Sequence, residues 1–302
     1  MSRKNDKPSY AMIATWLAVA LLLPLVATAC GSTTESAPSA LRDDAYFASL
    51  EQRYGARIGV HAIDTGDDTT LSYRSSTRFA YASTSKALTS ALVLQTASDA
   101  ELSKVVRYSP DDLLSYAPVT SQHVDTGMTL HDIVVAAVQY SDNTAANLLT
   151  SFLGGPAAVQ AKLREIGDDT TRVDRIEPDL NSAIRGDARD TTTAAAMATD
   201  LKTFALGSLL PEPRRDLYNT ILEGNTTGAD YIQAGVPEGS VVGDKTGSGD
   251  FGTRNDVAVV RPPGRAPIVL AIFTDRPGDQ SAQSDDSLIA DVTRHVMPMI
   301  EA

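Results

Sequence analysis

The chain has 302 residues, of which 42% are hydrophobic and 21% are charged, a composition that allows a substantial buried core. It carries 26 basic and 38 acidic side chains, for a net charge of −12. Such an acidic surface repels phosphate backbones and anionic lipid head groups, so we expect no nucleic-acid partner.

The first 29 residues are typical of an export signal. Three basic side chains precede the uncharged run from Ala11 to Ala29, which ends in the small-x-small pattern of a cleavage site. An uncleaved transmembrane helix is the alternative, although Pro24 and the small-residue ending favour cleavage. We therefore expect residues 1–29 to be a signal peptide and the protein to lie outside the cytoplasm, either secreted or anchored at the cell surface.

The only cysteine, Cys30, directly follows this segment, so no intrachain disulfide can form. The sequence Val26-Ala27-Thr28-Ala29-Cys30 resembles the lipidation box of bacterial lipoproteins, with Ala27 in place of the usual leucine. We expect a lipid anchor at Cys30, and the alternative is an ordinary cleaved signal that leaves a free thiol. Residues 30–40 are rich in Ser, Thr, Ala and Pro and predict a flexible tether.

After this tether, the spacing of apolar residues changes twice along the chain. Apolar residues recur at helical spacing up to Tyr54, and alternation at Ile58, Val60 and Ala62 predicts a strand that returns through a hairpin to residues 70–73. The middle of the chain is predicted to be mainly helical, with helices starting at Ser83 and covering residues 129–140, 143–153, 157–166, 193–206 and 212–222. Alternation returns after Gly239, where we expect strands at residues 241–244, 256–260 and 268–273 and a closing helix at 288–300.

Strands at both ends of a helical middle predict an α+β fold. We expect residues 41–302 to form one catalytic domain, with an antiparallel sheet and flanking helices built from 41–80 and 223–302. Residues 81–222 would form the helical part, with the active site between the two. The polar segment 168–190 is too long for a plain connector, so it is a candidate functional loop.

The stretch Ser83-Thr84-Ser85-Lys86 places a hydroxyl and an amine one helical turn apart. An amine with a lowered pKa can take the proton of a serine and make it a nucleophile. Three further motifs follow, Ser141-Asp142-Asn143, Glu177-Pro178-Asp179-Leu180-Asn181 and Lys245-Thr246-Gly247. Taken singly, the first of these three could be a helix cap, Glu177 in the second could be a solvated loop acid, and the third could be a strand end with a turn glycine.

Together and in this order, the motifs resemble those of class A serine β-lactamases and penicillin-binding proteins. The resemblance implies Ser83 as nucleophile, Lys86 as its base or the modulator of that base, and Ser141 as proton donor to the leaving nitrogen, assisted by Lys245. It implies that Asn143 binds a substrate carbonyl. The backbone N–H groups of Ser83 and Ser248 would form the oxyanion hole.

The segment around Glu177 resembles the omega-loop motif of class A β-lactamases. In that family this glutamate and the asparagine at the position of Asn181 hold the deacylating water, while the base of acylation is disputed between the glutamate and the lysine. Arg175 and Asp190 match the pair whose salt bridge closes the loop.

Further positions carry over from the same resemblance. Tyr116 would form a wall of the entrance, and Arg254 would bind the substrate carboxylate together with the Lys245-Thr246-Gly247 strand. Ser248 favours cephalosporins in addition to penicillins. Ala82 and Gly249 stand where some carbapenem-hydrolysing members have cysteines, so carbapenem hydrolysis has no support.

Two alternatives remain within the superfamily. A D,D-peptidase shares three of the motifs but lacks the Glu177 loop, and a β-lactam sensor would become acylated without turnover. We expect small-molecule β-lactam substrates, a monomer, and neither cofactor nor metal, because the four histidines are scattered without ligand spacing.

Overall fold

The computed structural model describes residues 40–301. The predicted signal peptide, Cys30 and nearly all of the predicted tether lie outside the described residues. Within residues 40–301, none of the helices is both long and apolar enough to cross a membrane.

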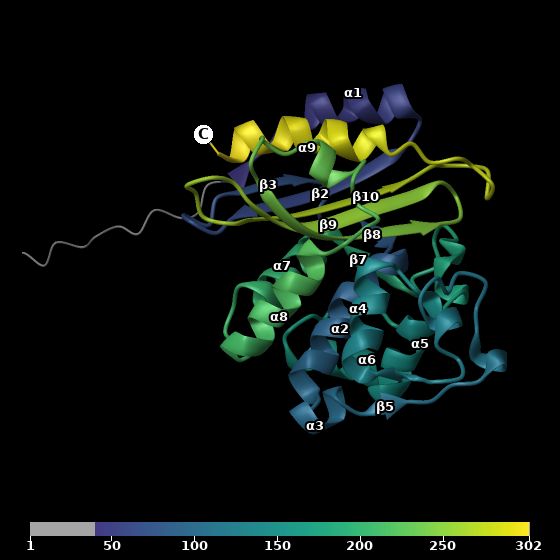
Figure 1. The fold of residues 1–302 in the computed structure, drawn as a ribbon. Helices are drawn as coiled ribbons and strands as arrows, with labels where there is room; N and C mark the ends of the chain where they lie inside the picture. Colours follow the sequence, from purple (N-terminus) through teal and green to yellow (C-terminus); the bar gives the residue numbers. More distant parts are fainter. Residues whose placement is uncertain (1–39, 302) are drawn as a thin grey trace, which may run out of the picture. The chain divides into compact units, whose positions relative to one another are not determined.

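The described part of the chain is built on a six-stranded sheet whose strands come from both ends of the sequence (Figure 1). The strand order is β1-β3-β2-β10-β9-β8, antiparallel throughout except for the β1–β3 pair. The bounds are Ala40–Leu41 for β1, Arg57–Asp64 for β2, Thr70–Tyr73 for β3, Val241–Gly249 for β8, Thr253–Arg261 for β9 and Ile268–Asp275 for β10. The predicted α+β fold with an antiparallel sheet is confirmed.

Helices cover both faces of this sheet, which explains why its central strands are apolar on both sides. On β9, Ala258 and Val260 belong to the same core as α1 (Asp44–Tyr54) and α9 (Ser287–Ile300). Val257 and Val259 point the other way, into the core shared with the helical part. Figure 1 shows α1 and α9 together on one side of the sheet and α7 and α8 on the other.

The helical part is organised around α2, whose residues from Lys86 to Leu94 are all buried. A helix that is buried all round must be surrounded by other elements, and α4, α5, α7 and α8 pack around it. The helices of this part are α2 (Ser85–Thr96), α3 (Asp99–Leu102), α4 (Leu130–Gln139), α5 (Asn143–Phe152), α6 (Pro156–Glu165), α7 (Ala194–Ala205) and α8 (Glu212–Glu223).

Two small strand pairs were not predicted, because strands of two or three residues leave no periodic signal. They are β4 (Arg78–Ala80) with β7 (Thr191–Thr193), and β5 (Val105–Val106) with β6 (Met128–Thr129). The first pair fastens the C-terminal end of the irregular loop 168–190 to the chain just before Ser83.

The predicted strand 241–244 is too short, and Gly247 lies within the strand and not in a turn. Strand β8 continues to Gly249 because its residues up to that point pair with β9, which itself begins at Thr253. Gly247 serves close packing here: a Cβ atom at this position would lie 2.9 Å from the carbonyl oxygen of Tyr81. The motif therefore lies along the strand edge, next to Ser83.

Candidate active site

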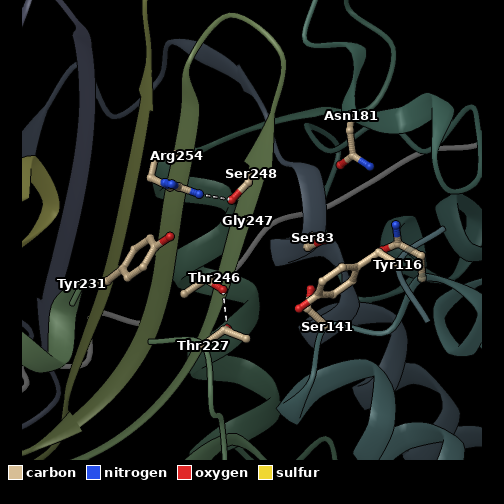
Figure 2. Close-up of a pocket in the computed structure, with 11 residues that line it drawn as sticks. Ser83, Tyr116, Ser141, Asn181, Thr227, Tyr231, Thr246, Gly247, Ser248 and Arg254 are labelled. Atoms are coloured by element: carbon tan, nitrogen blue, oxygen red, sulfur yellow. Dashed lines mark hydrogen bonds between the residues drawn. The ribbon is translucent and has the colours of Figure 1, made fainter. Parts of the chain in front are cut away.

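The predicted site residues gather around one cleft of about 340 Å³ between the sheet and the helical part (Figure 2). The cleft is lined by Ser83, Tyr116, Ser141, Asn143, Asn181, Thr227, Tyr231, Thr246, Gly247, Ser248 and Arg254. The other three predicted residues, Lys86, Glu177 and Lys245, are buried next to these lining residues. The sequence motifs, spread over 172 positions from Ser83 to Arg254, therefore form one site.

Ser83 lies in a short 3₁₀ turn, η1 (Ala82–Thr84), which leads directly into α2. Ala82 has φ +48°, in the left-handed region that is unfavourable for a side chain with a Cβ atom. The Asn255 amide on β9 donates to the carbonyl of Ala80 (2.8 Å), which holds the chain before this turn. The turn is thus fixed from the sheet side, and it presents Ser83 to the cleft.

The Lys86 ammonium lies at the centre of a polar cluster, and its side chain is only 2% exposed. Its Nζ is 2.9 Å from Ser83 Oγ, 2.6 Å from Asn143 Oδ1 and 2.8 Å from the Ser141 carbonyl oxygen. It also forms an ion pair with Glu177 (Nζ–Oε1 3.0 Å). Burial lowers the pKa of Lys86, and the neighbouring Glu177 carboxylate opposes that shift.

Glu177 reaches the cleft from the irregular loop, so this segment lies beside Ser83. Ser83 Oγ is 3.5 Å from Glu177 Oε1, and the Asn181 amide donates to Oε2. The backbone on either side of Glu177 is held by Asn147 of α5, whose side chain accepts from the Glu177 N–H and donates to its carbonyl, both at 2.9 Å. Glu177 is therefore held both at its backbone and at its carboxylate.

The neck of this loop is closed by the predicted pair of Arg175 and Asp190. The Asp190 carboxylate is fully buried, and it also accepts hydrogen bonds from the Tyr81 hydroxyl (3.1 Å) and the backbone N–H groups of Asp174 and Arg175 (2.9 Å each). Because Tyr81 lies two residues before Ser83, the Asp190 carboxylate also connects the loop to the η1 turn that carries Ser83.

The opposite wall of the cleft is β8. Lys245 is fully buried, and its Nζ donates to the carbonyl of Thr246 at 2.8 Å. Burial, and after it the charge of Lys86, lower the Lys245 pKa to about 7. The Thr246 hydroxyl points into the cleft and is hydrogen-bonded to the Thr227 hydroxyl (2.6 Å), as Figure 2 shows.

Arg254 lies on β9 beside Ser248, and its Nη1 donates to the Ser248 hydroxyl at 2.6 Å (Figure 2). Its guanidinium also forms an ion pair with Asp286 (Nε–Oδ1 2.6 Å) and lies over the ring of Tyr231, 5.5 Å from the ring centroid. Three neighbours therefore orient the guanidinium at the edge of the cleft.

Tyr116 is 51% exposed and forms the outer wall on the helical side, where the carbonyl of the same residue accepts from the Asn143 N–H (2.9 Å). Sequence reasoning missed Tyr231, Asn147 and Asp286. None of them belongs to a short motif, and each contacts a site residue that is at least 23 positions away in the chain. Only the tertiary structure identifies them as part of the site.

Among residues 40–301 no group of three or more His, Cys, Asp or Glu side chains is arranged to hold a metal ion. The side chains of the cleft offer a hydroxyl with an amine and a carboxylate in reach, and two cations that can attract an anionic ligand. This combination defines a serine acyl-transfer site.

Comparison with known proteins agrees with this assignment. The profile of the family described as "Beta-lactamase enzyme family" matches residues 44–299. A β-lactamase of Bacillus amyloliquefaciens is 52% identical over 248 residues, which cover 82% of this chain and 81% of that protein. A β-lactamase of Amycolatopsis lactamdurans is 51% identical over 248 residues, 82% of each chain.

Solved structures give the same result. The crystal structure of a halotolerant bacterial β-lactamase matches with a TM-score of 0.84 at 49% identity, covering 85% of this chain and 99% of that one. A class A β-lactamase from Clostridium kluyveri matches with a TM-score of 0.84 at 42% identity, covering 86% and 98%. The chain therefore belongs to the β-lactamase enzyme family, among its class A serine enzymes.

Proposed function

We propose that this enzyme opens the amide of β-lactam antibiotics through an acyl-enzyme on Ser83, and that water activated by Glu177 then releases the product. β-Lactam hydrolysis and the resulting antibiotic resistance are supported by the family and by relatives named β-lactamase at 52% and 50% identity. The observation that carries the detailed mechanism is the position of Glu177, 3.5 Å from Ser83 Oγ and bound to Asn181 through its other oxygen.

Acylation begins with loss of the Ser83 proton. Lys86 and Glu177 are both in reach, and the 3.0 Å contact between them allows a proton to pass from one to the other. The oxygen attacks the lactam carbonyl while backbone N–H groups of Ser83 and Ser248 stabilise the oxyanion. Ser141, whose Oγ is 3.3 Å from Lys86 Nζ, donates the proton that the departing lactam nitrogen needs.

Substrate binding uses the two walls of the cleft. Thr246, Ser248 and Arg254 lie beside the buried charge of Lys245 and would bind the substrate carboxylate through charge-assisted hydrogen bonds. Asn143 binds the side-chain carbonyl, since its Oδ1 is occupied by Lys86 and its amide nitrogen remains available as a donor. Ser248 favours cephalosporins in addition to penicillins.

Deacylation requires a water molecule between Glu177 and the acylated Ser83. Glu177→Ala removes its base, so we expect acylation to continue and deacylation to slow by at least about a hundredfold. Incubation with a cephalosporin should leave a stable adduct with one equivalent of drug, seen by intact-mass spectrometry. Asp179→Ala is the matched control, because Asp179 is an exposed acid of the same loop and its loss should leave turnover near the native rate.

The same assay distinguishes the alternatives. Turnover of a chromogenic cephalosporin well beyond one equivalent supports the hydrolase, whereas a burst that stops at one equivalent would indicate a D,D-peptidase or a sensor. Full-rate turnover by the Glu177→Ala enzyme would contradict the role given to Glu177.

We further propose that the chain is exported through its N-terminal 29 residues, is anchored by a lipid on Cys30, and acts as a monomer. The basic start, the uncharged run and the small residues before Cys30 support export and anchoring. A secreted form without the lipid is the alternative.

A further inference from the structure

A second cavity, of about 380 Å³, lies against the last part of the loop that carries Glu177. Residues 183–189 of the loop form one wall, and β2, β4 and the end of β10 contribute the other. Its charged lining residues are four arginines and two aspartates: Arg57, Arg78, Arg185, Arg189, Asp187 and Asp275. The cavity therefore carries an excess of two positive charges in a chain whose net charge is −12.

Both aspartates are already neutralised by arginines. Asp275 pairs with Arg57 through two contacts and receives a longer one from Arg185 (3.4 Å). Asp187 pairs with Arg189 at 2.7 Å, and the hydrogen bonds from Arg189 lower the Asp187 pKa to about 2, so this carboxylate stays ionised. Neither aspartate needs a further cation.

Arg78 is different, because its hydrogen bond goes to a neutral partner, the Thr191 hydroxyl at 3.1 Å. Arg185 likewise has donor groups to spare, since its one side-chain hydrogen bond among residues 40–301 is the 3.4 Å bond to Asp275. Guanidinium groups bind carboxylates and phosphates through paired, charge-assisted hydrogen bonds. The cavity thus offers two guanidinium groups with unused N–H donors, Arg78 on the sheet side and Arg185 on the loop.

We propose that this cavity binds a small multivalent oxyanion, with phosphate or carboxylate groups held between Arg78 and Arg185. At about 380 Å³ the cavity has room for a small polycarboxylate as well as for inorganic phosphate. Because the ligand bridges β4 and the loop, its binding stabilises the folded protein. The inference goes beyond β-lactam hydrolysis, and its test does not depend on activity.

The experiment measures binding of phosphate and of citrate to the full chain by titration calorimetry and thermal unfolding, against sodium chloride at equal ionic strength. We expect saturable stabilisation of the native protein by at least one of the two anions. Arg78→Gln should weaken the apparent Kd by about tenfold or more, since one charge-assisted contact is lost. Arg107→Gln is the matched control: Arg107 also donates to a neutral acceptor, the carbonyl of Asp125, but lies away from the cavity.

The substrate cleft also attracts anions, so a third variant is needed. Arg254→Gln weakens an anion bound in the substrate cleft and leaves one under the loop unaffected. Binding that is weakened by Arg78→Gln and unchanged by Arg254→Gln and Arg107→Gln supports the proposal. Binding that is weakened only by Arg254→Gln, affinity equal in all four proteins, or no stabilisation beyond that of chloride would overturn it.

Discussion

At the residue scale, burial sets the pH range in which Lys245 carries its positive charge. Its pKa is lowered to about 7 by burial and by Lys86, so its charge is complete at acidic pH and is lost as the pH rises through 7. That charge attracts the substrate carboxylate in the proposed mechanism. We expect kcat/KM of the native enzyme to fall above about pH 7.

The matched variant is Lys245→Arg, because arginine stays protonated throughout this range. Its kcat/KM is expected to be lower at pH 6, since a larger side chain must fit a fully buried site, but to change less between pH 6 and 9. The measurement is the pH profile of kcat/KM for a cephalosporin. Profiles of the same shape for both enzymes would show that Lys245 does not cause the alkaline loss.

A second residue-scale feature is the acid pair of Asp168, at the start of the loop, and Asp200 of α7. Both side chains are buried, and one oxygen of each lacks a donor among the described residues. Asp168 accepts from the backbone N–H groups of Thr170 and Thr171 through its other oxygen. Burial, and after it the neighbouring Asp168, raise the Asp200 pKa to about 9, so Asp200 keeps a proton that it can share with Asp168.

This pair makes folding depend on pH. The unfolded chain releases the Asp200 proton near pH 4, whereas the folded chain keeps it up to about pH 9, so the contribution to stability declines across that window. Asp200→Asn supplies a permanent donor and removes the decline. We expect its free energy of unfolding, relative to the native protein, to rise between pH 5 and pH 9 by at least about 1.4 kcal/mol, the value of one pKa unit.

Urea unfolding at several pH values measures this difference. Asp169→Asn, which changes the acid next to Asp168 in the sequence, is the control and should follow the native curve. Parallel curves for the native protein and Asp200→Asn would contradict a shared proton.

At the scale of the element, the loop 168–190 depends on the Asp190 carboxylate at its neck. Asp190 has φ +54°, a conformation that asparagine also tolerates, so Asp190→Asn removes the charge without straining the backbone. Arg175 then loses its partner in a mostly buried site. We expect a loss of about 3 kcal/mol in the free energy of unfolding, at the low end for a broken buried pair, and slower turnover of good substrates.

The control for this prediction is Asp99→Asn, which breaks an ion pair whose carboxylate is 97% exposed. Such a surface pair contributes at most about 1 kcal/mol. Thermal unfolding and steady-state kinetics compare the two variants with the native enzyme. Native stability together with native turnover in Asp190→Asn would show that the neck does not hold the loop.

At the scale of the whole molecule, the proposed anchor sets where the enzyme acts. Cys30→Ser removes the thiol that would carry the lipid, so we expect the protein to move from the membrane fraction to the medium and to keep its activity. Intact-mass analysis of the native membrane-bound protein should show a chain that begins at Cys30 and carries added lipid mass. Ser32→Ala serves as the control, and equal membrane retention of Cys30→Ser and native protein would argue against lipidation.

Much of this architecture could be predicted from sequence because its signals are local. Alternation at Ile58, Val60 and Ala62 predicted β2, and the helical spacing up to Tyr54 predicted the observed end of α1. The boundary of β8 was placed wrongly because glycines end strands in most contexts, whereas here Gly247 allows close packing against η1.

The sequence by itself determined the class of chemistry, since four short motifs in a fixed order specify a hydroxyl, two bases and a cationic wall. The tertiary structure decided everything that depends on burial or on partners far apart in the chain. Tyr231 and Asp286 meet Arg254 only after β9 is placed in the sheet, and the lowered pKa of Lys245 arises only once the core closes over it. The physical reason is that a motif shows which chemical groups are present. Their charge state and orientation depend on residues that come close only when the chain folds.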